Sequence, residues 1–123
     1  MKIIEAITKI DALKPNNYTP ENKIAWLTVL DGVIKKEIID THEGGEAITF
    51  NGYDASTPTD TELLVPAPYD DIYVRWLEAQ IDYSNADYGR YSNSMTMYNA
   101  AYSAYERYYN RNHMPLGKSF KYF

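Results

Sequence analysis

The sequence predicts a mainly α-helical fold: a helical bundle with one long C-terminal helix, or two helices in series, and a short β-hairpin or loop insertion near residues 46–66. Three observations predict it. Residues 3–13 carry isoleucines at helical spacing, Thr19-Pro20-Glu21 is a typical helix start, and large side chains recur every three or four residues from Leu77 to Tyr109. The length of 123 residues fits one domain, which we assign to residues 1–117.

The first two helices follow from periodicity and end signals. The first has an apolar stripe and is ended by Pro15 and Asn16-Asn17. In the second, Thr19 is the expected N-cap and Pro20 the first helical residue. We expect this helix to run to about Thr41 and Gly44-Gly45 to end it. Its expected buried residues are Ile24, Leu27, Leu30, Ile34 and Ile38.

The insertion differs in character from the helices around it. Ala47-Ile48-Thr49-Phe50 is a short β-like run, Asn51-Gly52 is a turn signal, and Leu63-Leu64-Val65 is a second apolar run. These features fit either a small β-hairpin or an ordered loop. Loops of about twenty residues are usually functional or disordered.

The C-terminal half holds the long helical pattern. Pro66-Ala67-Pro68 predicts an extended approach, and Asp70-Asp71 supplies an N-cap candidate. No proline follows until Pro115, although residues 84–94 contain weak helix formers. Either one helix of about forty residues or two helices meeting near residues 84–94 would fit. The unbroken heptad phase favours the single helix. Its face reads Leu77, Ile81, Ser84, Tyr88, Tyr91, Met95, Tyr98, Tyr102, Tyr105, Tyr109.

Tyrosine dominates this face, and tyrosine suits surfaces that are dry on one side and wet on the other. One interpretation is a core with polar tips at its rim, and another is a surface between subunits. Stacking on nucleic-acid bases would need a basic lining, which Arg90, Arg107 and Arg111 supply only sparsely. Our hypothesis for a subunit interface comprises Tyr88, Tyr91, Tyr98, Tyr102, Tyr105 and Tyr109.

The composition offers no catalytic constellation, so we expect no enzyme, no cofactor and no metal site. The chain has no cysteine, which excludes disulfides and thiolate ligands. Asp70-Asp71 and Asp60 with Glu62 are more typical of helix caps and surface charge than of an acid–base pair. His42 and His113 do not form a metal-binding set. The net charge of −5 argues against a nucleic-acid-binding face, and no apolar run approaches a membrane span.

The C-terminal tail, residues 118–123, is basic and aromatic, unlike the acidic body. It is either a disordered end or an arm that docks on a partner, because terminal aromatic rings often anchor on another protein. The candidate docking residues are Lys118, Phe120, Lys121, Tyr122 and Phe123.

Four segments of the chain together resemble a known family. They are Leu13-Lys14-Pro15-Asn16, Glu62-Leu63-Leu64-Val65-Pro66-Ala67-Pro68-Tyr69-Asp70-Asp71, Leu77-Glu78-Ala79-Gln80-Ile81-Asp82-Tyr83 and Tyr109-Asn110-Arg111-Asn112-His113-Met114-Pro115. The combination resembles head–tail connector (adaptor) proteins of tailed bacteriophages and prophages, over nearly the whole chain.

The resemblance implies a non-enzymatic helical subunit of the virion neck, assembled in the cytoplasm of the host bacterium. Such subunits form a ring, commonly of twelve copies, below the portal protein and next to a neighbouring neck or tail protein. DNA passes through the ring without specific binding, and the tail would reach the portal. Two alternatives stay open: a tail-completion or other neck protein, and a small helical partner-binding or regulatory domain of a prophage.

Overall fold

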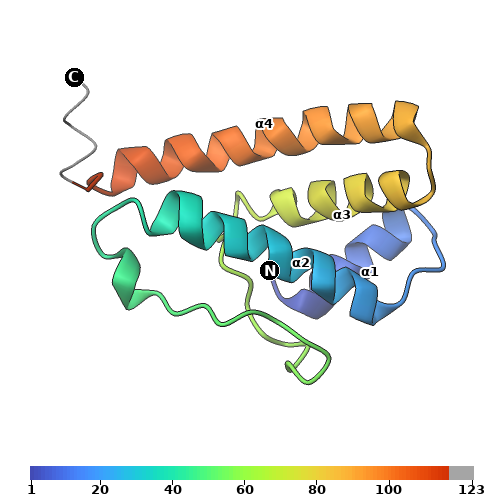
Figure 1. Ribbon diagram of the computed structural model, residues 1–123, viewed down its shortest axis with the longest axis horizontal. Coiled ribbons are helices and arrows are strands. Elements are labelled where there is room, and N and C mark those ends of the chain that lie inside the picture. The colour runs from blue at the N-terminus through green and yellow to red at the C-terminus, as the bar shows by residue number, and fades with distance from the viewer. Residues whose placement is uncertain (117–123) are drawn as a thin grey trace.

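A computed structural model describes residues 1–116, and within them the chain is mainly helical, as predicted. The α-helices are α1 (Ile3–Leu13), α2 (Pro20–Ile34), α3 (Asp71–Ser84) and α4 (Tyr88–Asn112) (Figure 1). A π-helical turn, η1 (Lys35–Ile39), continues α2, and a 3-10 turn, η2 (Gly45–Ala47), follows it. No helix in this part of the chain combines the length and the apolar character that crossing a membrane requires.

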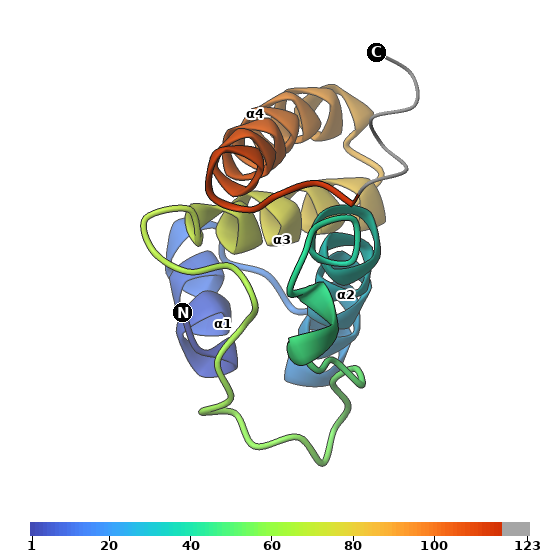
Figure 2. The same ribbon diagram turned by 90° about the vertical axis from the view of Figure 1, so that its left-hand side faces the viewer.

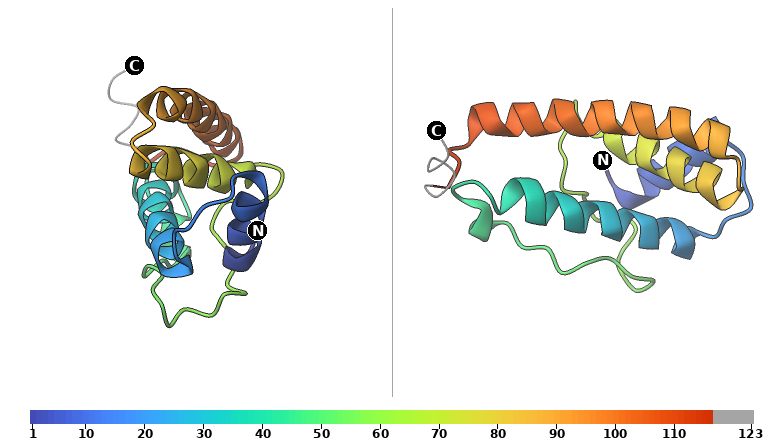
Figure 3. Two further views of the ribbon diagram at one scale, coloured as in Figure 1. Left: turned by 90° about the vertical axis from the view of Figure 1, so that its right-hand side faces the viewer. Right: turned by 45° about the horizontal axis from the view of Figure 1, so that its top comes forward.

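The helices are arranged around α3. It lies between α4 on one side and α1 and α2 on the other (Figure 2). α3 and α4 form an antiparallel hairpin, and α4 runs along the length of the molecule (Figures 1 and 3). The core between these layers is rich in isoleucine and leucine. Its fully buried members include Ile3, Ile10, Leu27, Leu30, Ile34, Ile38, Ile72, Leu77 and Ile81.

The predicted ends of the first two helices are confirmed. The Thr19 hydroxyl accepts a hydrogen bond from the Asn22 amide at 3.2 Å, and Pro20 is the first residue of α2. With η1, the helix reaches Ile39, close to the expected end at Thr41. Gly44 follows with a φ of 84°, in the left-handed region that glycine adopts at low cost.

The alternative of two helices that meet near residues 84–94 is confirmed, and the favoured single helix is wrong, because the chain folds back at Asn85–Asp87. Ala86 has a φ of 57°, and the Asp87 carboxylate caps α4 by accepting from the Arg90 amide at 3.2 Å. The heptad face is interrupted at this turn, because Ser84 and Tyr88 are exposed where α3 ends and α4 begins. Leu77 and Ile81 lie in the core from one side, and Tyr98 from the other.

The expected N-cap at the start of α3 is correct in position but not in bonding. Asp70 occupies the N-cap position, yet its side chain makes no cap hydrogen bond. Its carboxylate lies instead 3.5 Å from the N-terminal amine of Met1, which also pairs with Glu62 at 3.2 Å. These acids therefore anchor the N-terminus.

The insertion over residues 46–66 is an ordered loop, and the β-hairpin alternative is wrong. Within residues 1–116 the β-type pairs are two isolated bridges, Lys2 with Glu62 and His42 with Pro115. The loop forms local turns, such as the Thr57 amide donating to the Asp54 carbonyl at 3.1 Å, and hydrogen bonds to the helices instead of a hairpin ladder. Thr28 accepts from the Tyr53 amide at 2.8 Å, and Ile3 donates its amide to the Thr61 carbonyl at 3.0 Å.

Asp31 of α2 is the main tether of this loop. Its fully buried carboxylate accepts hydrogen bonds from the Tyr53 and Tyr73 hydroxyls, both at 2.6 Å, and from the Leu64 amide at 3.1 Å. Burial raises the pKa of Asp31, an effect that these hydrogen bonds only partly offset. One carboxylate thus joins α2, α3 and two points of the loop, Tyr53 and Leu64.

The end of the described chain is fixed against the turn that follows α2. The Leu116 amide donates to the Thr41 carbonyl at 3.0 Å, and the Glu43 amide donates to the Met114 carbonyl at 2.8 Å. The five predicted docking residues of the tail, Lys118, Phe120, Lys121, Tyr122 and Phe123, lie outside the described residues.

Candidate interaction surface

Three of the six tyrosines assigned to a subunit interface lie inside the subunit. Tyr98, Tyr105 and Tyr109 are 8%, 2% and 4% exposed. Tyr98 packs against Trp76, with ring centroids 4.9 Å apart, and Tyr109 packs edge-on against His42 at 4.9 Å. The interface assignment is corrected for these three rings, which belong to the core because α4 folds back over α3.

The other three tyrosines reach the surface to different degrees. Tyr102 is half-buried and donates its hydroxyl to Glu37 at 3.0 Å. Tyr91 is also half-buried, whereas Tyr88 is 62% exposed. Tyr83, which the heptad reading left off this face, is 56% exposed and contacts Tyr88 and Tyr91, with centroids 5.9 and 5.2 Å apart. We call Tyr83, Tyr88 and Tyr91 the elbow cluster.

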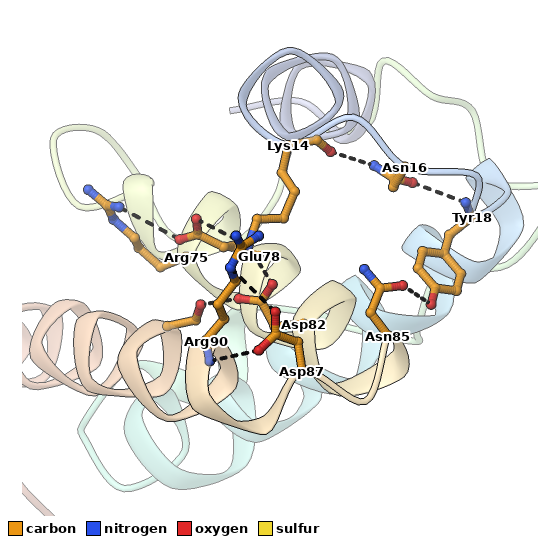
Figure 4. Close-up of polar contacts among 10 residues, drawn as sticks. Lys14, Asn16, Tyr18, Arg75, Glu78, Asp82, Asn85, Asp87 and Arg90 are labelled. Atoms are coloured by element: carbon orange, nitrogen blue, oxygen red, sulfur yellow. Dashed lines mark hydrogen bonds and ion pairs between the residues drawn. The ribbon is translucent and has the colours of Figure 1, made fainter.

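Polar contacts fix the end of α3 and the turn that follows it, next to the elbow cluster (Figure 4). Lys14, just after α1, forms an ion pair with the buried Asp82 of α3, and the Ser94 hydroxyl of α4 donates to the same carboxylate. The Tyr18 hydroxyl donates to Asn85 in the turn itself at 2.6 Å. The turn is therefore linked to α1, to α4 and to the segment between α1 and α2.

An open hollow of about 390 Å³ lies beside this network, lined by Lys14, Arg75, Glu78, Asp82, Arg90, Asn93, Ser94 and Met97. Its cations have partners within the chain. Arg75 pairs with Asp71 at 3.0 Å, and Arg90 with Asp87 at 3.3 Å. Because positive and negative groups alternate here, we interpret the hollow as the surface of a salt-bridge network between helices and not as an anion-binding site.

A second hollow opens on the outer side of α1. It measures about 210 Å³ and is lined by Ile4, Glu5, Thr8 and Lys9. Ile4 is 44% exposed, on the face of α1 opposite its buried isoleucines. We call this the α1 hollow.

The two histidines lie on either side of Tyr109 and have structural contacts. The ring nitrogens of His42 lie 2.6 Å from the Ile38 carbonyl oxygen and 2.6 Å from the Asn110 side-chain oxygen. His113 stacks on Tyr109 at 3.8 Å. No group of three or more His, Cys, Asp or Glu side chains within residues 1–116 is placed to hold a metal ion.

Two features of the structure, the buried Asp31 and the turn before α4, had signals in the sequence. Asp31 falls at helical spacing within the buried stripe Leu27, Leu30 and Ile34, which marks it as a buried carboxylate in need of partners. Asn85 and Gly89 flank the turn that exposes Tyr83 and Tyr88, and both are poor helix formers.

Comparison with known proteins found no match to this chain among family models, curated proteins or solved structures. Function is therefore inferred from the chain's own residues and from the resemblance of its four segments.

Proposed function

We propose that this protein is a virion structural protein, a head–tail connector subunit that forms a ring below the portal and continues the DNA channel to the tail. The observation that carries the proposal is the elbow cluster, with Tyr83 and Tyr88 more than half exposed on a cross-linked turn. Exposed aromatic patches mark sites of protein contact, and a pre-organised patch loses little entropy on binding.

The helical content supports a connector over the tail-completion alternative. Helices make up 63% of the described residues, whereas we expect tail-completion proteins to carry more β-structure. An α-helical subunit with a long α4 also suits side-by-side packing, because the side-chain ridges of one helix pack into the grooves of a neighbouring helix along its length.

The charge of the chain supports a channel that DNA traverses without binding. The formal net charge is −5, and DNA affinity depends on cationic groups that neutralise phosphates. The arginines on α3 and α4 near the elbow pair with acids of the same chain, Arg75 with Asp71 and Arg90 with Asp87. Such neutralised cations offer DNA little net attraction.

We further propose that the tail, residues 118–123, contacts the portal. Its starting point is supported by the backbone hydrogen bonds of Met114 and Leu116 to the segment after α2. A basic aromatic peptide that begins at a fixed point on an acidic subunit can reach only a limited area, about 20 Å for six residues. This geometry favours a partner surface next to the C-terminal end of α4.

Electron microscopy of the protein mixed with candidate portal rings tests the proposal, with the mass of the protein alone as its control. A closed ring, alone or stacked on a portal, is the expected result. A protein that stays monomeric and ignores every portal offered would contradict the connector role. That result would favour the small partner-binding domain.

A further inference from the structure

We propose that two copies of this chain exchange their α4 helices. The turn at Asn85–Asp87 straightens into helix, and α4 of each copy packs on α3 of the other, so that two long helices lie antiparallel in a dimer. The inference goes beyond the proposed function and does not depend on it, because it concerns the α3–α4 hairpin and neither the portal nor a ring.

Helix α4 forms a layer of its own in the subunit. Between Tyr88 and Asn112 it contains no isoleucine, leucine, valine or phenylalanine, and tyrosines such as Tyr98 and Tyr105 make its buried contacts. It packs chiefly against α3, with a smaller contact to η1, and runs along one side of the molecule (Figures 1 and 2). A second copy offers α4 the same surface, so exchange keeps these contacts.

The turn before α4 is short and strained. Three residues separate α3 from α4, and Ala86 among them has a φ of 57°, in a region unfavourable for a residue with a Cβ. Straightening removes this strain. No proline lies between Pro68 and Pro115, so helix can form through the turn. Short connections under strain favour the exchange of segments between copies.

The heptad spacing continues through the turn even though the folded face does not. The residues on either side of it read Ile81, Ser84, Tyr88, Tyr91, in steps of three, four and three. In the hairpin Ser84 and Tyr88 are exposed, Tyr88 by 62%. In a straight helix both return to the face that carries Ile81. The partner helix then covers the two positions that the hairpin leaves in solvent.

The register of the hairpin places Tyr88 at the centre of the exchanged pair. Trp76 packs against Tyr98, with ring centroids 4.9 Å apart, and Asp82 accepts from the Ser94 hydroxyl. The midpoints of these pairs along the chain fall at residues 87 and 88. Because exchange keeps the register, Tyr88 of one copy lies beside Tyr88 of the other. Burial of these two rings favours the dimer over two closed subunits.

A crosslink across the hairpin distinguishes exchange from any other dimer. Asp71 at the start of α3 and Ala104 of α4 line one hollow, and the chain has no cysteine of its own. In the closed subunit, a short bifunctional thiol crosslinker joins Asp71→Cys to Ala104→Cys within one chain. In the open chain the two positions lie about 50 Å apart along one helix. The crosslink of an exchanged dimer therefore joins two chains.

The full chain with both cysteines is concentrated, warmed to just below its melting temperature and cooled. Size-exclusion chromatography separates monomer from dimer, and a denaturing gel of each crosslinked fraction shows which chains are joined. We expect the monomer fraction to run as single chains and the dimer fraction as covalent pairs.

Variants of the turn shift the balance in opposite directions. Ala86→Gly relieves the strain in the closed form and weakens a continuous helix, so the dimer association constant should fall about tenfold or more. Asn85→Ala removes the acceptor of the Tyr18 hydroxyl and strengthens the helix, so the constant should rise about tenfold. The matched control is Ala100→Gly. Residue 100 is helical in both forms, so this variant melts earlier but keeps the same association constant.

The outcomes are distinct from those of the portal experiment. Dimers whose crosslinks stay within single chains are contacts between closed subunits and overturn the exchange. The exchange is also overturned if the unchanged protein and Asn85→Ala both stay monomeric after concentration and warming, or if Ala86→Gly and Asn85→Ala shift the constant in the same direction. Each of these results leaves the connector role standing, and a failure to form rings with portals leaves the exchange standing.

Discussion

Asp31 shows at the scale of one residue how the loop over residues 46–66 is kept in place. Its replacement by alanine would leave the Tyr53 and Tyr73 hydroxyls and the Leu64 amide without their acceptor. Buried polar groups left unsatisfied cost about 1–3 kcal/mol each. We expect Asp31→Ala to lower the free energy of unfolding by about 3 kcal/mol, measured by urea unfolding.

The control for this prediction is Asp60→Ala, at an exposed carboxylate of the same loop. Surface changes of this kind usually alter stability by less than about 0.5 kcal/mol. Limited proteolysis of the loop gives an independent readout, because the loop of the Asp31→Ala protein should be cut faster. Equal stability of the two variants would show that the Asp31 tether contributes nothing to the fold.

Ionisation of Tyr98 should lower the stability of the fold at alkaline pH. Burial, with a smaller contribution from the Glu37 charge, raises the pKa of Tyr98 to about 12, against about 10 for tyrosine in an unfolded chain. The unfolded state therefore loses its proton first as pH rises. The stabilisation is complete below about pH 10 and is lost between about pH 10 and pH 12.

The measurement is the urea midpoint across that pH range, for the unchanged protein and for Tyr98→Phe. Phenylalanine cannot ionise, so the midpoint of the variant should fall less steeply. Some pH dependence will remain, because burial also raises the pKa of Tyr73, Tyr105 and Tyr109. Identical slopes for the two proteins would contradict the assignment of Tyr98 to the core.

These tyrosines also mark what the sequence could and could not reveal about single residues. Their spacing identified residues that face the core on α3 and on α4, such as Leu77, Ile81 and Tyr98, but not the break between the two helices, where Ser84 and Tyr88 are exposed. It could not tell whether a partner helix of the same chain or of another covers that face, because a phenol ring suits both settings. The core contains Tyr98, Tyr105 and Tyr109, whereas Tyr88 is exposed. The difference arises from the fold-back, which is a tertiary feature.

At the scale of helices, the backbone conformation of Ala86 allows the turn between α3 and α4. Its φ of 57° lies in the left-handed region, which costs a residue with a Cβ roughly 1–2 kcal/mol. Glycine does not incur this cost, but it loses more conformational entropy on folding than alanine does, which offsets part of the gain in stability. We expect Ala86→Gly to stabilise the protein by about 0.5 kcal/mol, measured by thermal unfolding.

The same substitution elsewhere provides a control with the opposite sign. Ala100 is exposed within α4, and glycine in a helix interior costs about 1 kcal/mol. Ala100→Gly should therefore lower the melting temperature, while Ala86→Gly should raise it. If both variants lost the same stability, the turn at Ala86 would not have the left-handed backbone described.

The helices also differ in how well local signals defined them. The ends of α1 and the start of α2 follow from Pro15, Thr19 and Pro20, whose effects on the backbone are local. The break before α4 lies at Asn85, Ala86 and Asp87, of which asparagine and aspartate are weak helix formers and alanine is a strong one, so none of them is a helix breaker. Packing of α4 against α3 determines that the chain breaks there. Periodicity could not reveal the break, because large side chains recur at the same spacing before and after it.

For the whole molecule, residues 114–116 fix the point from which the chain continues into the tail, residues 118–123. Residues 114–116 are held by hydrogen bonds to Thr41 and Glu43. Deletion of residues 118–123 should therefore leave the melting temperature of the subunit unchanged. Portal binding should fall, because the deletion removes two lysines and three aromatic rings.

Electron microscopy with portal rings and a thermal melt of the same preparation measure both effects. Replacement of Lys118 and Lys121 by serine, with the rings retained, separates charge from aromatic contact. If the serine variant loses portal binding, and binding of the unchanged protein weakens with salt, the attraction comes from charge. If the serine variant still binds but the deletion does not, the attraction comes from the aromatic rings. A deletion that unfolds the subunit would contradict the docking role, since the tail would then be part of the fold.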